Sequence, residues 1–276
     1  MLNQGIRFDT NQQSAVALKQ CRHGPMLYLP RDQFVGRSLD LYGEFSELEA
    51  RVFDQILAPG AAVIEVGANI GAHTVHLAKL VGPNGNVLAF EPQRAMFYLL
   101  CANLALNEQF QVRAYRAAVG RQAGSAEVPL IDHRTDANFG GVSVGTTEHG
   151  EEVPLLTLDR FQFNALHLIK IDVEGMEIEV LLGARATIAQ HRPILYVEND
   201  RRENSHRLIQ LIEELGYDLH WHTPPLFNPE NFAGTSDNVF PGIVSINVLC
   251  VPKGRTMSLM GFRRVAGPND WWNEPG

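Results

Sequence analysis

Short apolar runs and helix-like segments alternate along the middle of the chain. Runs of strand length lie at 62–66, 86–90, 112–118, 166–172 and 193–198. Segments with apolar residues at helical spacing lie at 71–81, 93–107, 175–190 and 203–215. This alternation predicts a parallel sheet with helices on both faces. Because the strand-like runs are apolar at nearly every position, both faces of the sheet should be buried.

The pattern changes towards the end of the chain. Two more strand-like segments, 217–222 and 243–251, are joined by a loop at 223–241 that is rich in Pro, Asn and Gly. No helical pattern lies between them, and a parallel return would need a crossover, so this pair should be antiparallel. Added to the five parallel strands, the pair predicts an α/β fold with a seven-stranded, mostly parallel sheet.

The remaining segments suggest how the chain is divided. Residues 1–45 are expected to form an N-terminal cap, and residues 46–253 the main domain. Residues 120–160 hold several glycines and short strand-like pieces, which indicates an insertion at the sheet edge near the mouth of a site. The tail, 254–276, shows no clear element.

The main domain should begin with a helix. Ser46 and Glu49 have the spacing of a capping box, in which the serine accepts a helix amide and the glutamate reaches back. The helix should run through Leu57 and end at Pro59 and Gly60.

Charge and cysteine content narrow the class of protein. Acidic residues outnumber basic ones, 31 against 23, which gives a net charge of −8. This argues against a nucleic-acid partner, which would need a basic face. Three isolated cysteines indicate neither a disulfide framework nor a zinc knuckle. With no signal-like segment and no apolar run near ~18 residues, we expect a cytoplasmic protein without stable membrane insertion; a homodimer is left open.

The first of the central strands ends in a glycine-rich loop. Glu65 closes the strand, and Gly67, Asn69 and Gly71 follow at alternate positions. The second strand ends in Glu91. This is the skeleton of a βαβ nucleoside-binding unit, in which a later acidic residue takes the ribose hydroxyls. The loop lacks the third glycine of dinucleotide enzymes, which favours S-adenosylmethionine, a nucleoside without phosphate.

Carboxylates also follow the later strands. Asp172 and Glu174 close the fourth strand, and Glu198 closes the fifth. The carboxyl ends of parallel strands share one edge of the sheet, so these side chains should surround one crevice. A cationic sulfonium nucleoside would fit it. Helix capping is the competing role, and it weighs most for Glu198.

Three motifs of the chain resemble those of a known family. The segments 63–71, 156–159 (Leu-Thr-Leu-Asp) and 168–175 (Leu-Ile-Lys-Ile-Asp-Val-Glu-Gly) together resemble the FkbM family of class I S-adenosylmethionine-dependent methyltransferases. Residues 42–44 and 138–141 look like further family features, and the resemblance covers about residues 40–252. It implies a Rossmann-like class I methyltransferase fold and, as members typically show, O-methylation of sugars and natural products.

The resemblance implies roles for the cofactor-binding residues. Glu65, Gly67, Asn69 and Gly71 would surround the methionine portion, and Glu91 would bind the ribose.

It also implies roles for residues outside the two nucleoside motifs. Ala118 would face the adenine. Asp172 would lie near the methionine ammonium or the transferred methyl, and Glu174 on the substrate side. Tyr42 and Glu44 could close over the cofactor from the cap.

Methyl transfer to an unactivated hydroxyl is helped by a general base. The candidates are Glu174, His73, His220 and His222, of which His222 follows a strand and precedes the long loop; Asp172, Glu174 and His222 are therefore the predicted catalytic residues. Loops 132–145 and 223–241 are the candidates for acceptor recognition.

Metal-assisted transfer is the alternative mechanism. Asp159, Asp172, Glu174 and a histidine could hold Mg²⁺. No ligand spacing demands it, so no metal is predicted.

Two other functions stay open, and a third is disfavoured. One is an N-methyltransferase on the same fold, and another is a nucleoside-binding protein without activity. An NAD-dependent oxidoreductase is disfavoured, because residue 73 is histidine instead of the third glycine and no Tyr-x-x-x-Lys occurs. We expect Gly67→Val to push a side chain into the path of the cofactor.

Overall fold

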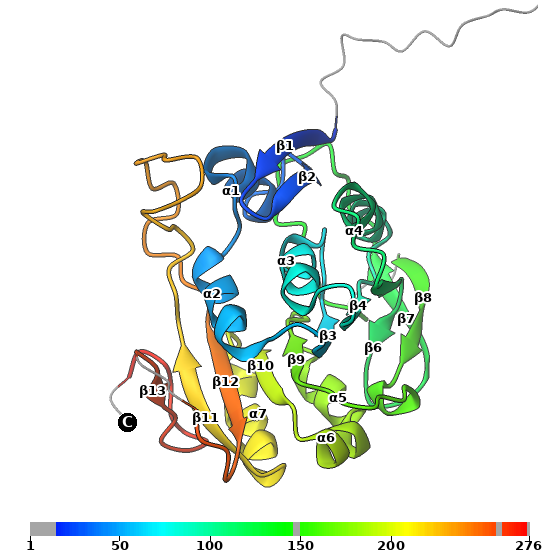
Figure 1. Ribbon diagram of the computed structural model, residues 1–276, viewed down its shortest axis with the longest axis vertical. Helices are drawn as coiled ribbons and strands as arrows, with labels where there is room; N and C mark the ends of the chain where they lie inside the picture. The colour runs from blue at the N-terminus through cyan, green and yellow to red at the C-terminus, as the bar shows by residue number, and fades with distance from the viewer. Residues whose placement is uncertain (1–14, 146–149, 258–260, 275–276) are drawn as a thin grey trace, which may run out of the picture.

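The computed structural model describes residues 15–145, 150–257 and 261–274. Its main sheet contains eight strands in the order β13-β11-β12-β10-β9-β3-β4-β5 (Figure 1). Five neighbouring strands are parallel: β5 (Val112–Tyr115), β4 (Asn86–Phe90), β3 (Ala62–Val66), β9 (Leu168–Ile171) and β10 (Ile194–Glu198). The predicted α/β class, with a large and mostly parallel sheet, is confirmed.

The antiparallel part of the sheet lies beyond β10. Strand β12 (Asn247–Pro252) runs antiparallel both to β10 and to β11 (Tyr217–His222), as predicted for the final pair. The tail adds a two-residue strand, β13 (Arg263–Arg264), which pairs with β11. The prediction of seven strands missed it, because two arginines carry no strand pattern. Asp270 fixes this segment by accepting Arg263 Nη1 at 2.8 Å.

Helices cover both faces of the sheet, because alternate residues of each strand point to opposite sides. On one face, α2 (Glu47–Ile56) and α3 (Ala72–Val81) pack over Val63 and Leu168. On the other face, three helices pack over Ile64 and Ile169: α5 (Glu177–Leu182), α6 (Arg185–His191) and α7 (Arg202–Glu214).

The segment predicted as one helix at 175–190 is two helices. Gly183 separates α5 from α6, and a Cβ on Gly183 would stand 2.0 Å from the carbonyl oxygen of Gly120. The close approach of these two backbones therefore places the break. Asp159 then accepts the amide of Thr187 at 2.8 Å near the start of α6.

The insertion forms a separate small sheet. Its three strands have the order β6 (Ala118–Val119), β8 (Gly150–Leu156) and β7 (Gly124–Pro129), and a short 3₁₀ helix, η1 (Leu158–Arg160), follows them. The apolar run predicted as one strand at 112–118 is therefore shared by two sheets, with its last residue in β6.

The N-terminal segment packs against α4 (Arg94–Leu106). It consists of a hairpin, β1 (Ala17–Cys21) and β2 (Gly24–Tyr28), and the helix α1 (Val35–Tyr42). Asn103 of α4 is fully buried and bonds both the amide and the carbonyl of Leu27, at 2.7 and 2.9 Å. Its amide also donates to Ile70 O at 2.8 Å, so one side chain links the hairpin to the glycine loop.

The start of α2 differs from the predicted capping box. Ser46 is the residue before the helix, as predicted, but its hydroxyl donates to the Glu49 carboxylate at 2.6 Å instead of accepting a helix amide. Ser46 has φ of +45°, which turns its side chain away from the helix amides.

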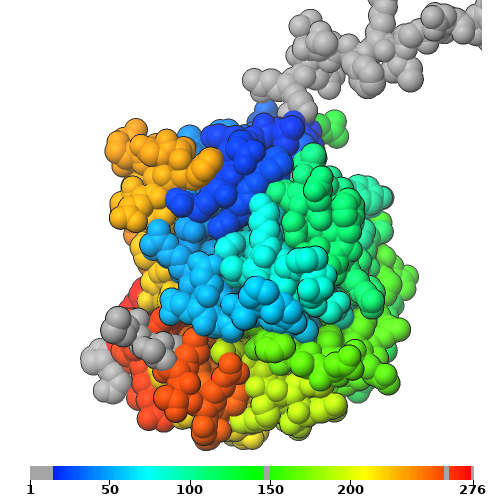
Figure 2. All heavy atoms as spheres, in the orientation of Figure 1, coloured from blue at the N-terminus to red at the C-terminus, as the bar shows by residue number. Residues whose placement is uncertain are grey.

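The long loop after β11 lies against this N-terminal segment (Figure 2). Phe232 N donates to Glu44 Oε2 at 2.8 Å, and Thr235 Oγ1 donates to Leu41 O at 3.1 Å. Among the described residues no helix is long and apolar enough to cross a membrane. The predicted division at residue 45 stays a prediction.

Candidate active site

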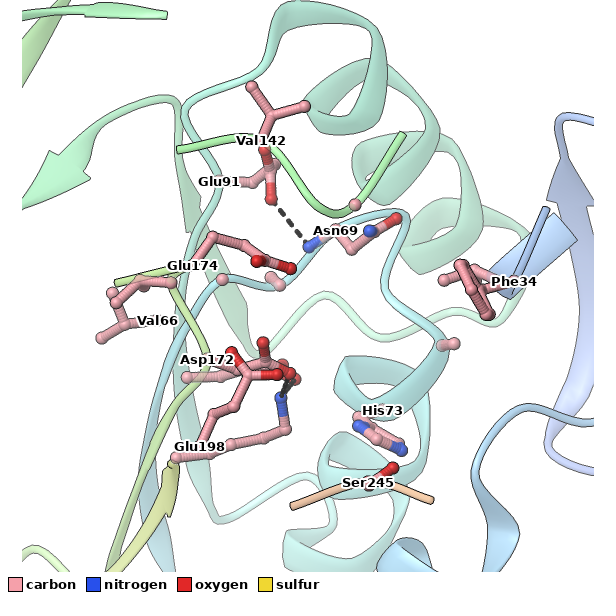
Figure 3. Close-up of a pocket in the computed structure, with 18 of the residues that line it drawn as sticks. Phe34, Val66, Asn69, His73, Glu91, Val142, Asp172, Glu174, Glu198 and Ser245 are labelled. Carbon is pink, nitrogen blue, oxygen red and sulfur yellow. Dashed lines mark hydrogen bonds and ion pairs between the residues drawn. The ribbon is translucent and has the colours of Figure 1, made fainter. Parts of the chain in front are cut away.

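A cavity of about 320 Å³ opens at the carboxyl ends of β3, β4, β9 and β10 (Figure 3). Its floor is the glycine loop, and part of its wall comes from the insertion through Asn138, Gly140, Val142 and Val144. α1, α2 and residues 243–247 contribute further parts of the wall. The predicted crevice is therefore present, and it is enclosed by segments far apart in sequence.

Glu91 holds the end of β4 against the glycine loop. Its Oε2 accepts the amide of Asn69 at 2.8 Å, and its Oε1 accepts the amide of Gln93 at 2.8 Å. Burial raises the pKa of Glu91 to about 7, although these two amides oppose the shift. Each carboxylate oxygen can accept a further hydrogen bond, so Glu91 can still receive a ribose diol.

Glu65 is fully buried at the end of β3 and lines the cavity. Its Oε2 accepts the Thr74 hydroxyl at 2.6 Å, while its Oε1 has no hydrogen-bond partner. Burial raises the pKa of Glu65 to about 7, and Lys170 and Thr74 partly offset the shift. A buried acceptor without a partner is costly, which points to a ligand donor at this position.

Lys170 is the main residue that the sequence analysis missed. It is only 2% exposed, and its Nζ donates to Asp172 Oδ2 at 3.0 Å and lies 4.0 Å from Glu65 Oε1. Burial lowers the pKa of Lys170, but Asp172, Glu65 and Glu49 outweigh it and hold the pKa above its usual value. Its position in the sequence could have indicated this role, because a lysine inside a strand that is otherwise apolar needs a buried partner.

Gly67 and Gly71 lie in close contact with other parts of the chain. A Cβ on Gly67 would stand 1.7 Å from Asp172 O, and a Cβ on Gly71 would stand 2.7 Å from Leu100 Cδ1. Both residues have positive φ, +87° and +86°. A larger residue at Gly67 would therefore first meet the backbone after β9, and the expected effect on the path of the cofactor stays a prediction.

Asp172, Glu174 and Glu198 offer carboxylate oxygens that all lie within 4.8 Å of one another. Figure 3 shows Asp172 and Glu198 directed towards each other. Burial raises the pKa of Glu174 to about 7, and Asp172 and Asp200 add to this while Arg201 opposes it. Burial and the same neighbouring acids hold the pKa of Glu198 well above its usual value. The structure thus gathers these three predicted carboxylates.

Protein cations already compensate two of these acids. Lys170 pairs with Asp172 at 3.0 Å, and Arg201 Nη2 donates to Glu174 Oε2 at 2.7 Å. Asp159, named for the Mg²⁺ alternative, instead accepts two amides near the start of α6 and is not part of the cavity wall. That the site needs no metal stays a prediction.

Ala118 and its two neighbours line the cavity on the side of the small sheet, next to Glu91. Ala118 is buried, and its strand pairs with β8. Its predicted contact with the adenine stays a prediction.

Tyr42 and Glu44 are not part of the cavity wall, so the cavity does not support their predicted contact with the cofactor. The Tyr42 hydroxyl donates to Asp237 O and accepts the amide of Val239, each at 2.8 Å. Glu44 Oε2 accepts Arg22 Nε at 2.6 Å, and its Oε1 accepts Asn228 Nδ2 at 2.8 Å. Both side chains fix the long loop to the cap. Phe34 and Phe45 line the cavity in their place.

The predicted catalytic role of His222 is not supported. Its ring packs against Phe262, and its Nδ1 lies 2.7 Å from the Tyr196 hydroxyl, outside the cavity wall. Burial lowers its pKa to about 4. The physical reason is that β12, β10 and β9 lie between β11 and β3, the strand that leads into the glycine loop. His220, on the same strand, is also outside the cavity wall.

His73 lines the cavity and is buried, and its Nε2 has no hydrogen-bond partner. Burial, with Lys170 adding, holds its pKa well below the usual value, so the ring is neutral.

The two loops assigned to the acceptor contribute unequally. Residues 138–144 of the insertion line the cavity as predicted, but of the 223–241 loop only Leu226 does. The segment just after it contributes more, through Ser245 and Asn247 among others. Most of the long loop instead contacts the cap, a contact that no local pattern predicts.

The fold and the cavity together define a Rossmann-like class I methyltransferase, and the comparison with known families agrees. Residues 65–219 match the model of the methyltransferase FkbM domain, so the chain belongs to this family. The match spans more than half of the chain and both nucleoside-binding motifs.

The curated relatives carry related names. "Methyltransferase 1" of Beauveria bassiana (strain ARSEF 2860) is 25% identical over 143 residues, and "Methyltransferase sdnD" of Sordaria araneosa is 27% identical over 159 residues. Each alignment covers 44% of this chain, and they cover 57% and 59% of the two relatives. The chain therefore matches a little over half the length of these proteins.

Among solved structures, a methyltransferase FkbM from Methylobacillus flagellatus KT aligns with a TM-score of 0.46 at 17% identity. The alignment covers 74% of this chain and 50% of that chain.

The family implies S-adenosylmethionine, and the cavity residues fit it. Glu91 can accept the ribose hydroxyls, and the unpartnered Glu65 Oε1 can accept an ammonium. The carboxylates on the β9 and β10 side complement a positive charge at the sulfonium.

Proposed function

We propose that this protein is an S-adenosylmethionine-dependent methyltransferase that methylates a hydroxyl group on a sugar or a secondary metabolite. The observation that carries the proposal is one continuous cavity. It joins Glu91 and Glu65, which suit a nucleoside amino acid, to Asp172 and Glu174, where an acceptor would enter.

The chain's own residues act by holding two reactants in line. Glu91 fixes the ribose end and Glu65 the amino-acid end, so the reacting centre faces the ends of β9 and β10. When bound, S-adenosylmethionine supplies an electrophilic methyl group. Burial of the cavity strengthens the electrostatic contacts of these carboxylates, because little water competes with them.

Glu174 is the residue proposed to take the proton of the acceptor hydroxyl. It lines the cavity, and its pKa of about 7 is near the pH at which a general base works best. Arg201 holds its Oε2 at 2.7 Å, and its backbone has φ of +55°, so its position is well defined. Asp172 lies beside it and adds negative charge next to the sulfonium side.

A transfer assay tests this proposal. The protein is incubated with methyl-labelled S-adenosylmethionine and separate pools of sugars, hydroxylated natural products and amines. Label in a sugar or hydroxylated pool, and loss of at least about ten-fold in Glu174→Gln with unchanged cofactor affinity, is the expected result. Glu179→Gln, at a partly exposed residue of α5 outside the cavity wall, is the matched control. Label only in amines would replace O-methylation by N-methylation.

A further inference from the structure

Lys170 sits in the middle of a buried polar row that crosses the sheet. In register it lies beside Glu65 of β3 on one side and Tyr196 of β10 on the other. Neighbours in register on parallel strands share one face of the sheet, so all three side chains point towards α2 and α3. Lys170 is 2% exposed, and its side chain also lines the cavity.

The ammonium of Lys170 lies among three acids but hydrogen-bonds only one of them, Asp172. Its Nζ donates to Asp172 at 3.0 Å and lies 4.0 Å from Glu65 Oε1, too far for a hydrogen bond. Glu49 of α2 also acts on it electrostatically. The titratable groups that act on it or respond to it come from all the surrounding elements: Glu49 of α2, Glu65 of β3, His73 of α3, Asp172 after β9 and Tyr196 of β10.

A buried carboxylate is stable as an anion only when a cation or strong donors compensate it. Thr74 serves one oxygen of Glu65, and Lys170 is the cation that faces the other. The gap of 4.0 Å leaves the buried Glu65 Oε1 without a hydrogen-bond partner, and Glu65 is one of the residues that line the cavity. Lys170 therefore favours the ionised form of Glu65 without forming a hydrogen bond to its unpartnered oxygen.

We propose that Lys170 is a positioning residue for cofactor binding, which keeps Glu65 ionised so that its free oxygen receives the ammonium of the cofactor's amino-acid end. The proposal rests on the proposed function, since it needs a ligand with an amino-acid end. Without Lys170, Glu65 would hold a proton at neutral pH. Binding an ammonium would then require loss of that proton, so affinity would depend on pH in a higher range.

Two ligands separate this role from a structural one. S-adenosylhomocysteine carries the amino-acid end but no sulfonium charge, and 5′-methylthioadenosine carries the nucleoside without the amino acid. The ratio of their affinities reports on the amino-acid end alone, because effects of Glu91 or of general loosening act on both ligands. The affinities are measured by calorimetry between pH 6 and 9, on wild type, Lys170→Met and Lys253→Met, an exposed-lysine control.

In wild type and in Lys253→Met, the ratio should rise as the pH passes about 7, the pKa of Glu65. In Lys170→Met the rise should move up by about one pH unit or more, which lowers the ratio at pH 7 about five-fold or more. An equal loss of affinity for both ligands at every pH, or an unchanged ratio of the two affinities, would overturn the proposal.

A second variant covers the case in which Lys170→Met does not fold. If thermal unfolding shows that Lys170→Met does not fold, Lys170→Met/Glu49→Gln removes one acid together with the ammonium and is held to the same criterion. Failure of that variant as well would mean that Lys170 acts through the fold, against the proposal. Absence of binding of both ligands to wild type would instead reject the proposed function.

Discussion

Glu91 and Asn69 are joined by a hydrogen bond of 2.8 Å from the Asn69 amide to Glu91 Oε2, although they follow different strands. Asn69 has φ of +50°, a left-handed conformation that directs its amide to the end of β4. One carboxylate therefore both shapes the glycine loop and faces the cavity. This coupling explains why an acid after the second strand and glycines after the first occur together.

Glu91→Gln should weaken binding of S-adenosylhomocysteine by about ten- to a hundred-fold, because hydrogen bonds to a charged acceptor are worth about 1.5–3 kcal/mol. Calorimetry measures the effect, and Glu108→Gln, at a residue just after α4, is the control. An unchanged affinity would remove the ribose assignment.

Gly67→Ala should lower the stability of the ligand-free protein by about 2–4 kcal/mol, because its Cβ would meet Asp172 O at 1.7 Å. Gly60→Ala is the matched control, since Gly60 has φ of +89° and open space around its Cβ position. Thermal unfolding of both variants without ligand separates the clash from the strain of a positive φ. Equal shifts would show that the contact with Asp172 O does not matter.

Glu198→Gln should stabilise the ligand-free protein more at pH 8 than at pH 5. Burial raises the pKa of Glu198 well above its usual value of 4.5, so the folded state keeps a proton that the unfolded state loses. The stability of wild type therefore falls as the pH rises above 4.5, and glutamine removes this titration. Thermal unfolding of wild type and Glu198→Gln at the two pH values measures this effect. A stability difference between the two proteins that does not change with pH would contradict the prediction.

EDTA should leave methyl transfer unchanged. Lys170 and Arg201 already pair with Asp172 and Glu174, which reduces the need for a divalent cation among the three neighbouring carboxylates. The transfer rate is compared before and after chelation, with added Mg²⁺ as the second arm. Loss of activity that Mg²⁺ restores would contradict the prediction.

The sheet could be predicted closely from the sequence. The strands at 62–66 and 86–90 match β3 and β4, because each is an apolar run of strand length bounded by glycine or acid. The carboxylates of the site followed directly, since the ends of parallel strands meet at one edge. These features depend on local patterns, which a single sequence displays.

The contacts of the cap could not be predicted in the same way. Tyr42 and Glu44 lie close to the site in sequence order, yet they bond the loop at 228–239, almost two hundred positions away. The predicted catalytic role of His222 was not supported for a related reason, because strand order, not sequence order, sets its distance from the cavity. A buried partner for Lys170 could have been predicted, because this lysine lies within an otherwise apolar strand.

A calorimetric titration of the purified protein with S-adenosylmethionine, S-adenosylhomocysteine and NAD⁺ tests the proposed cofactor most directly. We expect micromolar binding of the two adenosyl compounds and none of NAD⁺, because the glycine loop and Glu91 suit a nucleoside without a pyrophosphate. Binding of NAD⁺, or no binding of either adenosyl compound with and without acceptor, would contradict it.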